Sequence, residues 1–179
     1  MNKLLSHKRM TLNFALAFGI LCLTLTGANA ETQSQGHSLA SAMAKDAAAK
    51  VLDKLHHYAA DADWDNYFAL YSKDAVFIGT DAAEYWDMKQ FASYARPTDG
   101  WRYQPISRRL MQFGDTMVFD ELLDSQSYGT SRGTGTLILN ENGWQIAQYH
   151  LSFPIPNDIA KSITQQIKTH EAGVRNSEQ

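Results

Sequence analysis

Two neighbouring segments of the chain carry glycines and polar residues where a buried β-strand would carry apolar side chains. Residues 132–139 and 144–152 flank an Asn-Gly turn, an arrangement typical of a β-hairpin. Strict alternation along both strands puts Gly133 and Gly135 on the same sheet face as His150. Two positions without side chains beside a polar one predict a pocket wall with room for a ligand.

His150 is the first candidate for chemistry. An unpaired polar group on a core strand costs about 1 to 3 kcal/mol, so this imidazole is either paired inside the protein or serves a ligand. Imidazole can also accept and donate a proton near neutral pH. Gln148, on the same face, is better suited to orienting a ligand carbonyl than to proton transfer.

A carboxylate could assist this histidine. Asp120 and Glu121 are adjacent in a predicted strand, so only one of them faces inward unless a bulge intervenes. We favour Glu121, because alternation groups it with the apolar Phe119 and Leu123. The inward carboxylate would act as a base or orient His150. The alternative, that both are ordinary surface carboxylates, stays open.

Further candidates lie earlier in the chain. Asp81, followed by Glu84, fits a capping box for a helix running to about residue 95, which explains both residues without a ligand. Asp81 also lies at a strand end where a cavity would open. Six aromatic residues could together line an apolar cavity, although each alone also fits a core position. They are Trp64, Tyr67, Phe68, Trp86, Trp101 and Tyr103.

The sequence contains no motif that indicates a metal or cofactor site. His56 and His57 are neighbours on a predicted helix and point about 100° apart, which is the wrong spacing for a shared metal. The Gly-x-Ser-x-Gly string at 129–133 precedes a strand, whereas a nucleophile elbow precedes a helix. The glycines at 133 and 135 likewise precede a strand, so they form no phosphate cradle. We predict neither a metal nor a cofactor.

The N-terminus predicts export. Basic residues precede an apolar stretch at 12–25, and Ala28-Asn29-Ala30 has the cleavage pattern of a secretory signal peptide. We expect cleavage after Ala30 and a bacterial periplasmic protein. The single cysteine, Cys22, lies in this leader, so no disulfide is expected afterwards. No later apolar run approaches the roughly 20 residues of a membrane span.

The charge of the mature chain argues against nucleic-acid binding. The leader holds three of the 16 basic and none of the 19 acidic residues, which leaves 13 basic against 19 acidic residues and a net charge of −6. No clustered basic surface is present.

The order of predicted elements is typical of an α+β fold. A flexible tether at 31–43 precedes a domain at 44–156, and a C-terminal helix with its tail follows at 157–179. Helices are expected at 44–62, at 64–71 after a cap at Asp63, and at 81–95. Strands are expected at 75–80, 101–113, 116–126, 132–139 and 144–153.

The order and the amino-acid sequence of these elements resemble the SnoaL-like branch of the nuclear-transport-factor-2-like superfamily, over roughly residues 44–156. The resemblance rests on the order of four segments, Phe-Ile-Gly-Thr-Asp leading into Glu-Tyr-Trp at 77–86, Phe-Asp-Glu-Leu-Leu at 119–123, Arg-Gly-Thr-Gly at 132–135, and 144–152. It implies a curved antiparallel sheet wrapped around the N-terminal helices as a cone with an internal cavity. It also implies a homodimer formed through the outer sheet face.

The resemblance implies a fold better than a reaction, because the superfamily includes isomerases, cyclases, dehydratases and members without catalysis. We rank first an exported protein that binds a small, largely apolar molecule in the cavity. The alternative is a cofactor-free isomerase, cyclase or hydro-lyase, in which His150 with Glu121 or Asp120 moves a proton on a carbonyl compound. In a third possibility, side chains fill the cavity and the protein acts through its outer sheet face.

Overall fold

The computed structural model describes residues 23–177 and divides the chain into two units, Met1–Ala40 and Ser41–Gln179. Helix α1 (Leu23–Ala60) includes the segment 31–43, where we expected a tether. The segment 31–43 contains no proline, so it is compatible with such a helix. Most of the predicted signal peptide, residues 1–22, lies outside the described residues.

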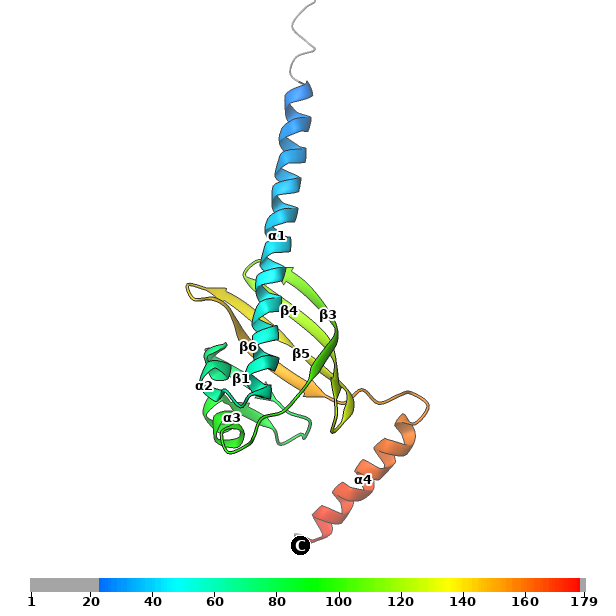
Figure 1. Cartoon of the computed structure of the whole chain (residues 1–179). Helices are drawn as coiled ribbons and strands as arrows, with labels where there is room; N and C mark the ends of the chain where they lie inside the picture. Colours follow the sequence, from blue (N-terminus) through cyan, green and yellow to red (C-terminus); the bar gives the residue numbers. More distant parts are fainter. Residues whose placement is uncertain (1–22, 178–179) are drawn as a thin grey trace, which may run out of the picture. The chain divides into compact units, whose positions relative to one another are not determined.

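The second unit has the predicted α+β organisation (Figure 1). A curved, open sheet of six strands has the order β2-β1-β6-β5-β4-β3. All neighbouring strands are antiparallel except β1 and β6, which pair in parallel, so the sheet is mixed. After α1, the elements are α2 (Trp64–Ala69), β1 (Tyr71–Ile78), β2 (Tyr85–Asp87), α3 (Met88–Ala95), β3 (Gln104–Phe113), β4 (Thr116–Ser125), β5 (Gly129–Asn140), β6 (Gly143–Ser152) and α4 (Ala160–Ser177).

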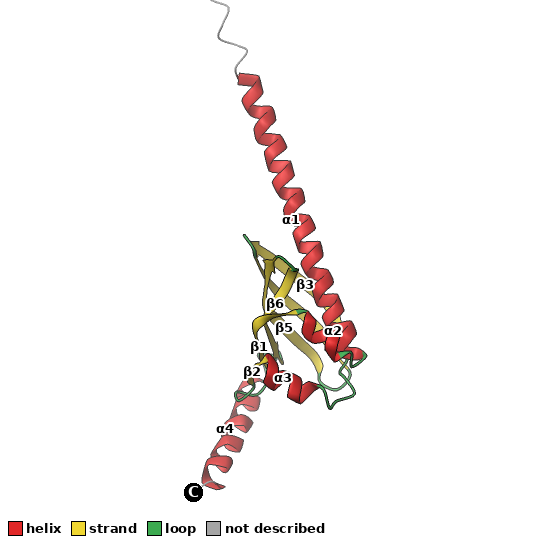
Figure 2. Cartoon of the chain, turned by 90° about the vertical axis from the view of Figure 1, so that its left-hand side faces the viewer, coloured by secondary structure: helices red, strands yellow, loops and turns green. Residues whose placement is uncertain are grey.

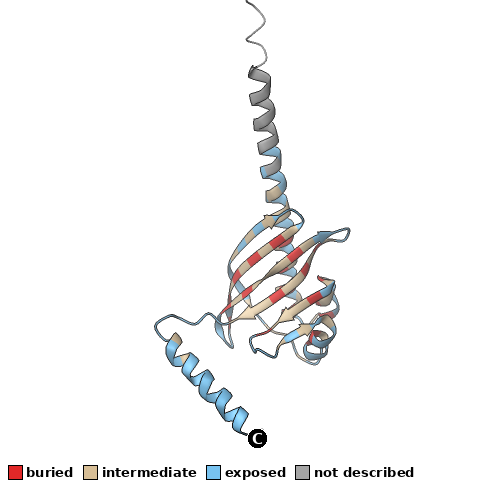
Figure 3. Cartoon of the chain, turned by 180° about the vertical axis from the view of Figure 1, so that it is seen from behind, coloured by how far each residue is buried: buried red, intermediate tan, exposed pale blue. Residues whose placement is uncertain are grey.

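The core lies between one face of the sheet and the helices. Figure 2 shows α2, α3 and the C-terminal part of α1 on the same side of the sheet. Leu52, Leu55 and Ala59 form a buried stripe of α1 at helical spacing. Buried positions alternate with more exposed ones along the central strands (Figure 3), as expected for a sheet with one face in the core. The buried face of the sheet is called the inner face below.

The prediction that a helix begins at Asp81 with a capping box is wrong. Helix α3 begins only at Met88, and its capping box is formed by Asp87 and Gln90. Asp81 and Glu84 nevertheless make the local bonds expected of their spacing, because Asp81 accepts from the amide of Ala83 and Glu84 accepts from the amide of Asp81. These bonds close a turn between β1 and β2 instead of starting a helix.

A β-bulge in strand β6 changes which side chains reach the inner face. Near the turn, Leu139 pairs with Trp144 and Leu137 with Ile146, as strict alternation predicts. The next pair is Thr136 with Gln148, so Ala147 is an extra residue in β6. Beyond the bulge the inner face therefore receives the odd-numbered residues of β6.

No helix within residues 23–177 is long and apolar enough to cross a bilayer.

Candidate ligand-binding cavity

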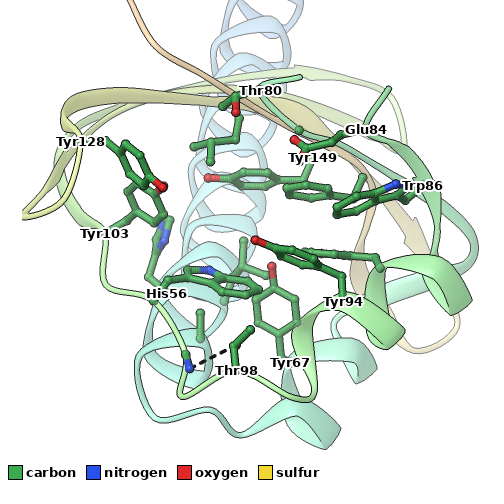
Figure 4. Close-up of a pocket in the computed structure, with 18 of the residues that line it drawn as sticks. His56, Tyr67, Thr80, Glu84, Trp86, Tyr94, Thr98, Tyr103, Tyr128 and Tyr149 are labelled. Carbon is green, nitrogen blue, oxygen red and sulfur yellow. Dashed lines mark hydrogen bonds between the residues drawn. The ribbon is translucent and has the colours of Figure 1, made fainter. Parts of the chain in front are cut away.

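A cavity of about 410 Å³ opens on the inner side of the sheet (Figure 4). Such a volume lies within the range of small-molecule sites. Half of its lining residues are aromatic, and they come from helices, strands and the connecting segments. The lining consists of Leu55, His56, Ala59, Tyr67, Phe77, Gly79, Thr80, Glu84, Trp86, Phe91, Tyr94, Thr98, Gly100, Trp101, Tyr103, Ser127, Tyr128, Tyr149, Leu151 and Phe153.

A buried ion-pair network supports one wall of this cavity. Glu121 of β4 is fully buried, with its side chain 0% exposed. Its Oε1 accepts a hydrogen bond of 2.6 Å from Nε of Arg108, and its Oε2 lies 3.0 Å from Nε2 of His56. Arg108 also donates to Asp53 at 2.8 Å and to the carbonyl oxygen of Ala49 at 3.0 Å. The network joins α1 to strands β3 and β4 and fixes the His56 ring at the cavity.

His56 is the imidazole that lines the cavity. Its side chain is only 10% exposed, and one ring nitrogen is used by the Glu121 carboxylate. A carboxylate in this position sets the orientation and tautomer of the ring. The pair therefore has the arrangement of a histidine base and its orienting group.

Tyrosine hydroxyls form a second polar feature of the cavity. The hydroxyls of Tyr67 and Tyr71 lie 3.1 Å apart and are hydrogen-bonded. Burial raises the pKa of Tyr67, Tyr71 and Tyr149 above the ordinary value for tyrosine, and for Tyr149 the charge of Glu121 raises it further. These hydroxyls stay protonated at neutral pH. Tyr67 and Tyr149 line the cavity, whereas Tyr71 lies behind it as the hydrogen-bond partner of Tyr67.

The two glycines of β5 do lie on the inner face, but protein side chains occupy the space beside them. A Cβ at Gly133 would lie 2.2 Å from the hydroxyl oxygen of Tyr149. At Gly135 it would clash with the backbone carbonyl oxygen of Gln148 and lie 2.8 Å from the ring of Phe119. The bare backbone therefore accommodates two aromatic rings, and the expected ligand gap at this point is wrong.

The inward placement of His150 and Gln148 is also wrong. The bulge at Ala147 turns Tyr149 and Leu151 into the cavity, and strand alternation then directs His150 to the opposite face. Neither His150 nor Gln148 is among the lining residues. The structure does not bring His150 together with Glu121.

The two carboxylates of β4 lie on opposite faces of the sheet, and Glu121 is the inward one, as predicted. Glu121 faces inward, whereas Asp120 lies on the outer face and accepts from Arg132 at 3.1 Å. Asp81 does not line the cavity, and Glu84 from the same turn does. The carboxylate at the strand end is therefore present, three residues later than expected.

The predicted aromatic residues divide into lining and supporting groups. Tyr67, Trp86, Trp101 and Tyr103 line the cavity. Trp64 and Phe68 are absent from the lining and pack behind it, Trp64 with its ring centroid 4.7 Å from that of Trp101 and Phe68 5.2 Å from Tyr67. These two support the wall from the core.

Sequence reasoning missed His56, Glu84 and Tyr149. His56 could have been found, because it continues the apolar stripe of Leu52, Leu55 and Ala59 at i, i+3, i+4 and i+7 spacing. A histidine on such a stripe faces the core side of its helix. The inward position of Tyr149 follows from the β-bulge in β6, which the local sequence does not predict.

No cluster of three or more histidine, cysteine or acidic residues suited to a metal occurs within residues 23–177.

Comparisons with known proteins agree with this architecture. The family model for the SnoaL-like domain matches residues 48–156. No curated protein matches the chain. Among solved structures, an NTF2-like protein from Cytophaga hutchinsonii has a TM-score of 0.54 at 17% identity, with 62% of this chain and 98% of that chain covered.

Two further structures show the same fold. An uncharacterised protein with a cystatin-like fold from Caulobacter vibrioides has a TM-score of 0.55 at 10% identity and covers 67% of this chain and 95% of its own. A candidate dehydratase of the NTF2-like family from Streptomyces avermitilis has a TM-score of 0.53 at 10% identity and covers 62% and 96%. From the family match and the shared fold, the chain belongs to the SnoaL-like domain family, with an NTF2-like fold.

Proposed function

We propose that the protein binds a small, largely aromatic or apolar molecule in the cavity on the inner side of the sheet. The observation that carries the proposal is the cavity itself, about 410 Å³ of space lined mainly by aromatic rings and tyrosine hydroxyls. Aromatic walls contribute apolar contact area, and a few fixed polar groups orient the ligand.

Adjacent residues of strand β2 provide a matched test. Trp86 lines the cavity, whereas Tyr85 is 64% exposed and does not. The neutral fluorescent probe N-phenyl-1-naphthylamine should bind the wild-type protein with increased emission. The substitution Trp86→Ala should weaken binding at least about 5-fold, because an aromatic wall is lost, and Tyr85→Ala should leave it unchanged. Equal binding by both variants would refute the cavity as the site.

A second candidate function is proton transfer on a carbonyl compound, and the His56–Glu121 pair favours it. The 3.0 Å contact orients a histidine at the cavity, and the protonated tyrosine hydroxyls could donate to a developing oxyanion. This role replaces the one we expected for His150. The candidate dehydratase from Streptomyces avermitilis is consistent with such chemistry on this fold.

Hydrogen–deuterium exchange at the carbon acid phenylacetone tests this second function. NMR in D₂O should show exchange accelerated by the wild-type protein and abolished by His56→Ala. The control His150→Ala should keep the full rate, because His150 is on the opposite sheet face. Exchange at the buffer rate with the wild-type protein would leave binding as the function.

We also propose export of the protein with cleavage after Ala30, which the leader pattern supports. The N-terminal residue of the protein recovered from a periplasmic fraction should be Glu31. An uncleaved N-terminus would contradict this proposal.

We further propose a homodimer through the outer sheet face. Met111 and Phe113 of β3 are 54% and 65% exposed, and such side chains are typical of an interface. Light scattering after size-exclusion chromatography should give twice the chain mass, and the substitution Phe113→Lys should shift the protein toward the monomer.

A further inference from the structure

The charges around the cavity indicate which molecule it selects. Glu84 is the one carboxylate among the lining residues, and no lysine or arginine lines the cavity. Within the part of the chain that the structure describes, Glu84 makes no ion pair with a lysine or arginine. The wall therefore carries an acidic group whose charge no protein cation balances directly.

The backbone holds the Glu84 carboxylate at this wall. Its Oε2 accepts from the amide of Asp81 at 3.2 Å, and its own carbonyl accepts from the amide of Gly79 at 2.8 Å. A Cβ at position 79 would lie 1.9 Å from Oε2 of Glu84. Gly79 thus leaves the space in which the carboxylate lies, and a side chain at position 79 would displace it.

The ion-pair network behind the opposite wall brings no lysine or arginine into the cavity. Glu121 and Asp53 both contact Arg108, whose guanidinium does not reach the lining. The side chains of Glu121, Asp53 and Arg108 together carry one negative charge. In Figure 4, His56 lies on the side of the cavity opposite Glu84 and Trp86. An anionic ligand would meet the Glu84 carboxylate and would find no lysine or arginine in the lining.

The aromatic rings of the cavity favour a cation, because their faces are electrostatically negative. Trp86 and Tyr94 pack with ring centroids 5.0 Å apart and a 41° tilt, and the rings of Phe77 and Tyr149 are parallel to within 4°. The face of an aromatic ring is negative because of its quadrupole, and aromatic side chains that line a pocket can bind quaternary ammonium groups. A purely apolar ligand would fill the same space but would gain nothing from Glu84.

We infer that the ligand is an organic cation, a quaternary ammonium or protonated amine attached to a flat apolar body. Its charged group lies near Glu84 and the face of Trp86, and its apolar body lies among the remaining rings. This inference rests on the proposed binding function and adds the charge of the ligand.

A pair of probes with the same shape and different charge tests the inference. 3-Hydroxyphenyltrimethylammonium and 3-tert-butylphenol differ in one atom, nitrogen against carbon, and in one positive charge. Calorimetry with the full chain at low ionic strength should show the cation binding about 5- to 30-fold tighter. In a cavity without charge selectivity the more hydrophobic tert-butyl compound would bind tighter.

Matched variants separate the effect of Glu84 from the net charge of the protein. Glu84→Gln keeps an oxygen that can accept from the Asp81 amide and should reduce the advantage of the cation by about 5-fold. Glu141→Gln makes the same charge change in the exposed β5–β6 turn and should not alter it. Binding of 3-tert-butylphenol should be the same in both variants.

Three results would overturn the inference. Equal or tighter binding of 3-tert-butylphenol would refute the selection for a cation and leave the proposed binding function intact. Equal losses in Glu84→Gln and Glu141→Gln would refute the role of Glu84. If neither probe bound to a protein with normal thermal unfolding, the proposed function would fail together with the inference.

Discussion

Removing the guanidinium of Arg108 should destabilise the protein strongly, because it leaves the fully buried Glu121 carboxylate without its cation. Arg108 is 14% exposed and donates the 2.6 Å hydrogen bond to Glu121. The substitution Arg108→Met keeps much of the apolar stem and removes the charge. Breaking a buried ion pair on one side costs about 3 to 5 kcal/mol.

The neighbouring arginine is a matched control. The Arg109 side chain is 85% exposed, and its Nη1 lies 3.8 Å from Oδ2 of Asp120 on the outer face, a long distance for an ion pair. An exposed pair of this kind contributes about 1 kcal/mol or less, so Arg109→Met should have little effect. The two substitutions are chemically identical and one residue apart, and they differ in burial and in the partner that they leave behind.

A double substitution tests whether the cost comes from the unpaired charge. In Arg108→Met/Glu121→Gln the buried carboxylate is gone, while the amide can still bond to His56. This variant should recover about 2 kcal/mol or more relative to Arg108→Met alone. Urea unfolding followed by tryptophan fluorescence measures each free energy of unfolding, and the midpoint of thermal unfolding should fall by roughly 6 to 20 °C in Arg108→Met.

Two results would refute this reasoning. A loss below about 1 kcal/mol in Arg108→Met would mean that Glu121 does not depend on this cation. A double variant that is no more stable than Arg108→Met would mean that the lost contacts of the arginine stem, and not the buried charge, account for the loss.

Three further predictions concern other parts of the fold. Gly133→Ala should cost about 1 to 3 kcal/mol in chemical denaturation, because the new methyl group meets the Tyr149 hydroxyl, whereas Gly173→Ala in α4 has open space and should not destabilise. Asp87→Ala should cost about 1 kcal/mol by removing the cap of α3, and Asp81→Ala, which caps no helix, should cost less in the same thermal-unfolding assay. Because burial raises the pKa of Tyr67, Tyr71 and Tyr149 in the folded state, stability should be complete below pH about 10 and should fall above it by up to about 1.4 kcal/mol per pH unit for each tyrosine. Absorbance at 295 nm should then show these tyrosines ionising only as the protein unfolds, and titration of all eight near pH 10 in the folded protein would contradict this.

Much of the fold could be predicted from the sequence because its signals are local. The Asn-Gly turn, the alternation in β4 and the Asp63 cap of α2 each depend on a few neighbouring residues. The inward parity of Glu121 followed from the same alternation. The parallel pairing of β1 with β6 could not be read in this way, because it joins segments about 70 residues apart.

The candidate site was harder to predict, because a single extra residue in β6 reverses its faces. Up to Ile146 the strand follows the alternation expected from the sequence. Beyond the extra residue Ala147, Tyr149 faces inward, whereas unbroken alternation had predicted His150 there. The glycines of β5 were correctly assigned to the inner face, but their space belongs to Tyr149 and Phe119. Only tertiary packing determines whether such space holds a ligand or a side chain.

The four tryptophans offer the most direct test that the cavity binds a small aromatic molecule. Trp86 and Trp101 line the cavity, the ring of Trp64 packs against that of Trp101 at a 45° tilt, and Trp144 is buried and is not among the lining residues. In protein labelled with 5-fluorotryptophan, titration with N-phenyl-1-naphthylamine should shift the ¹⁹F resonances of Trp86 and Trp101 and leave that of Trp144 in place. An unchanged spectrum, or a shift of Trp144 as large as that of Trp86, would contradict binding in this cavity.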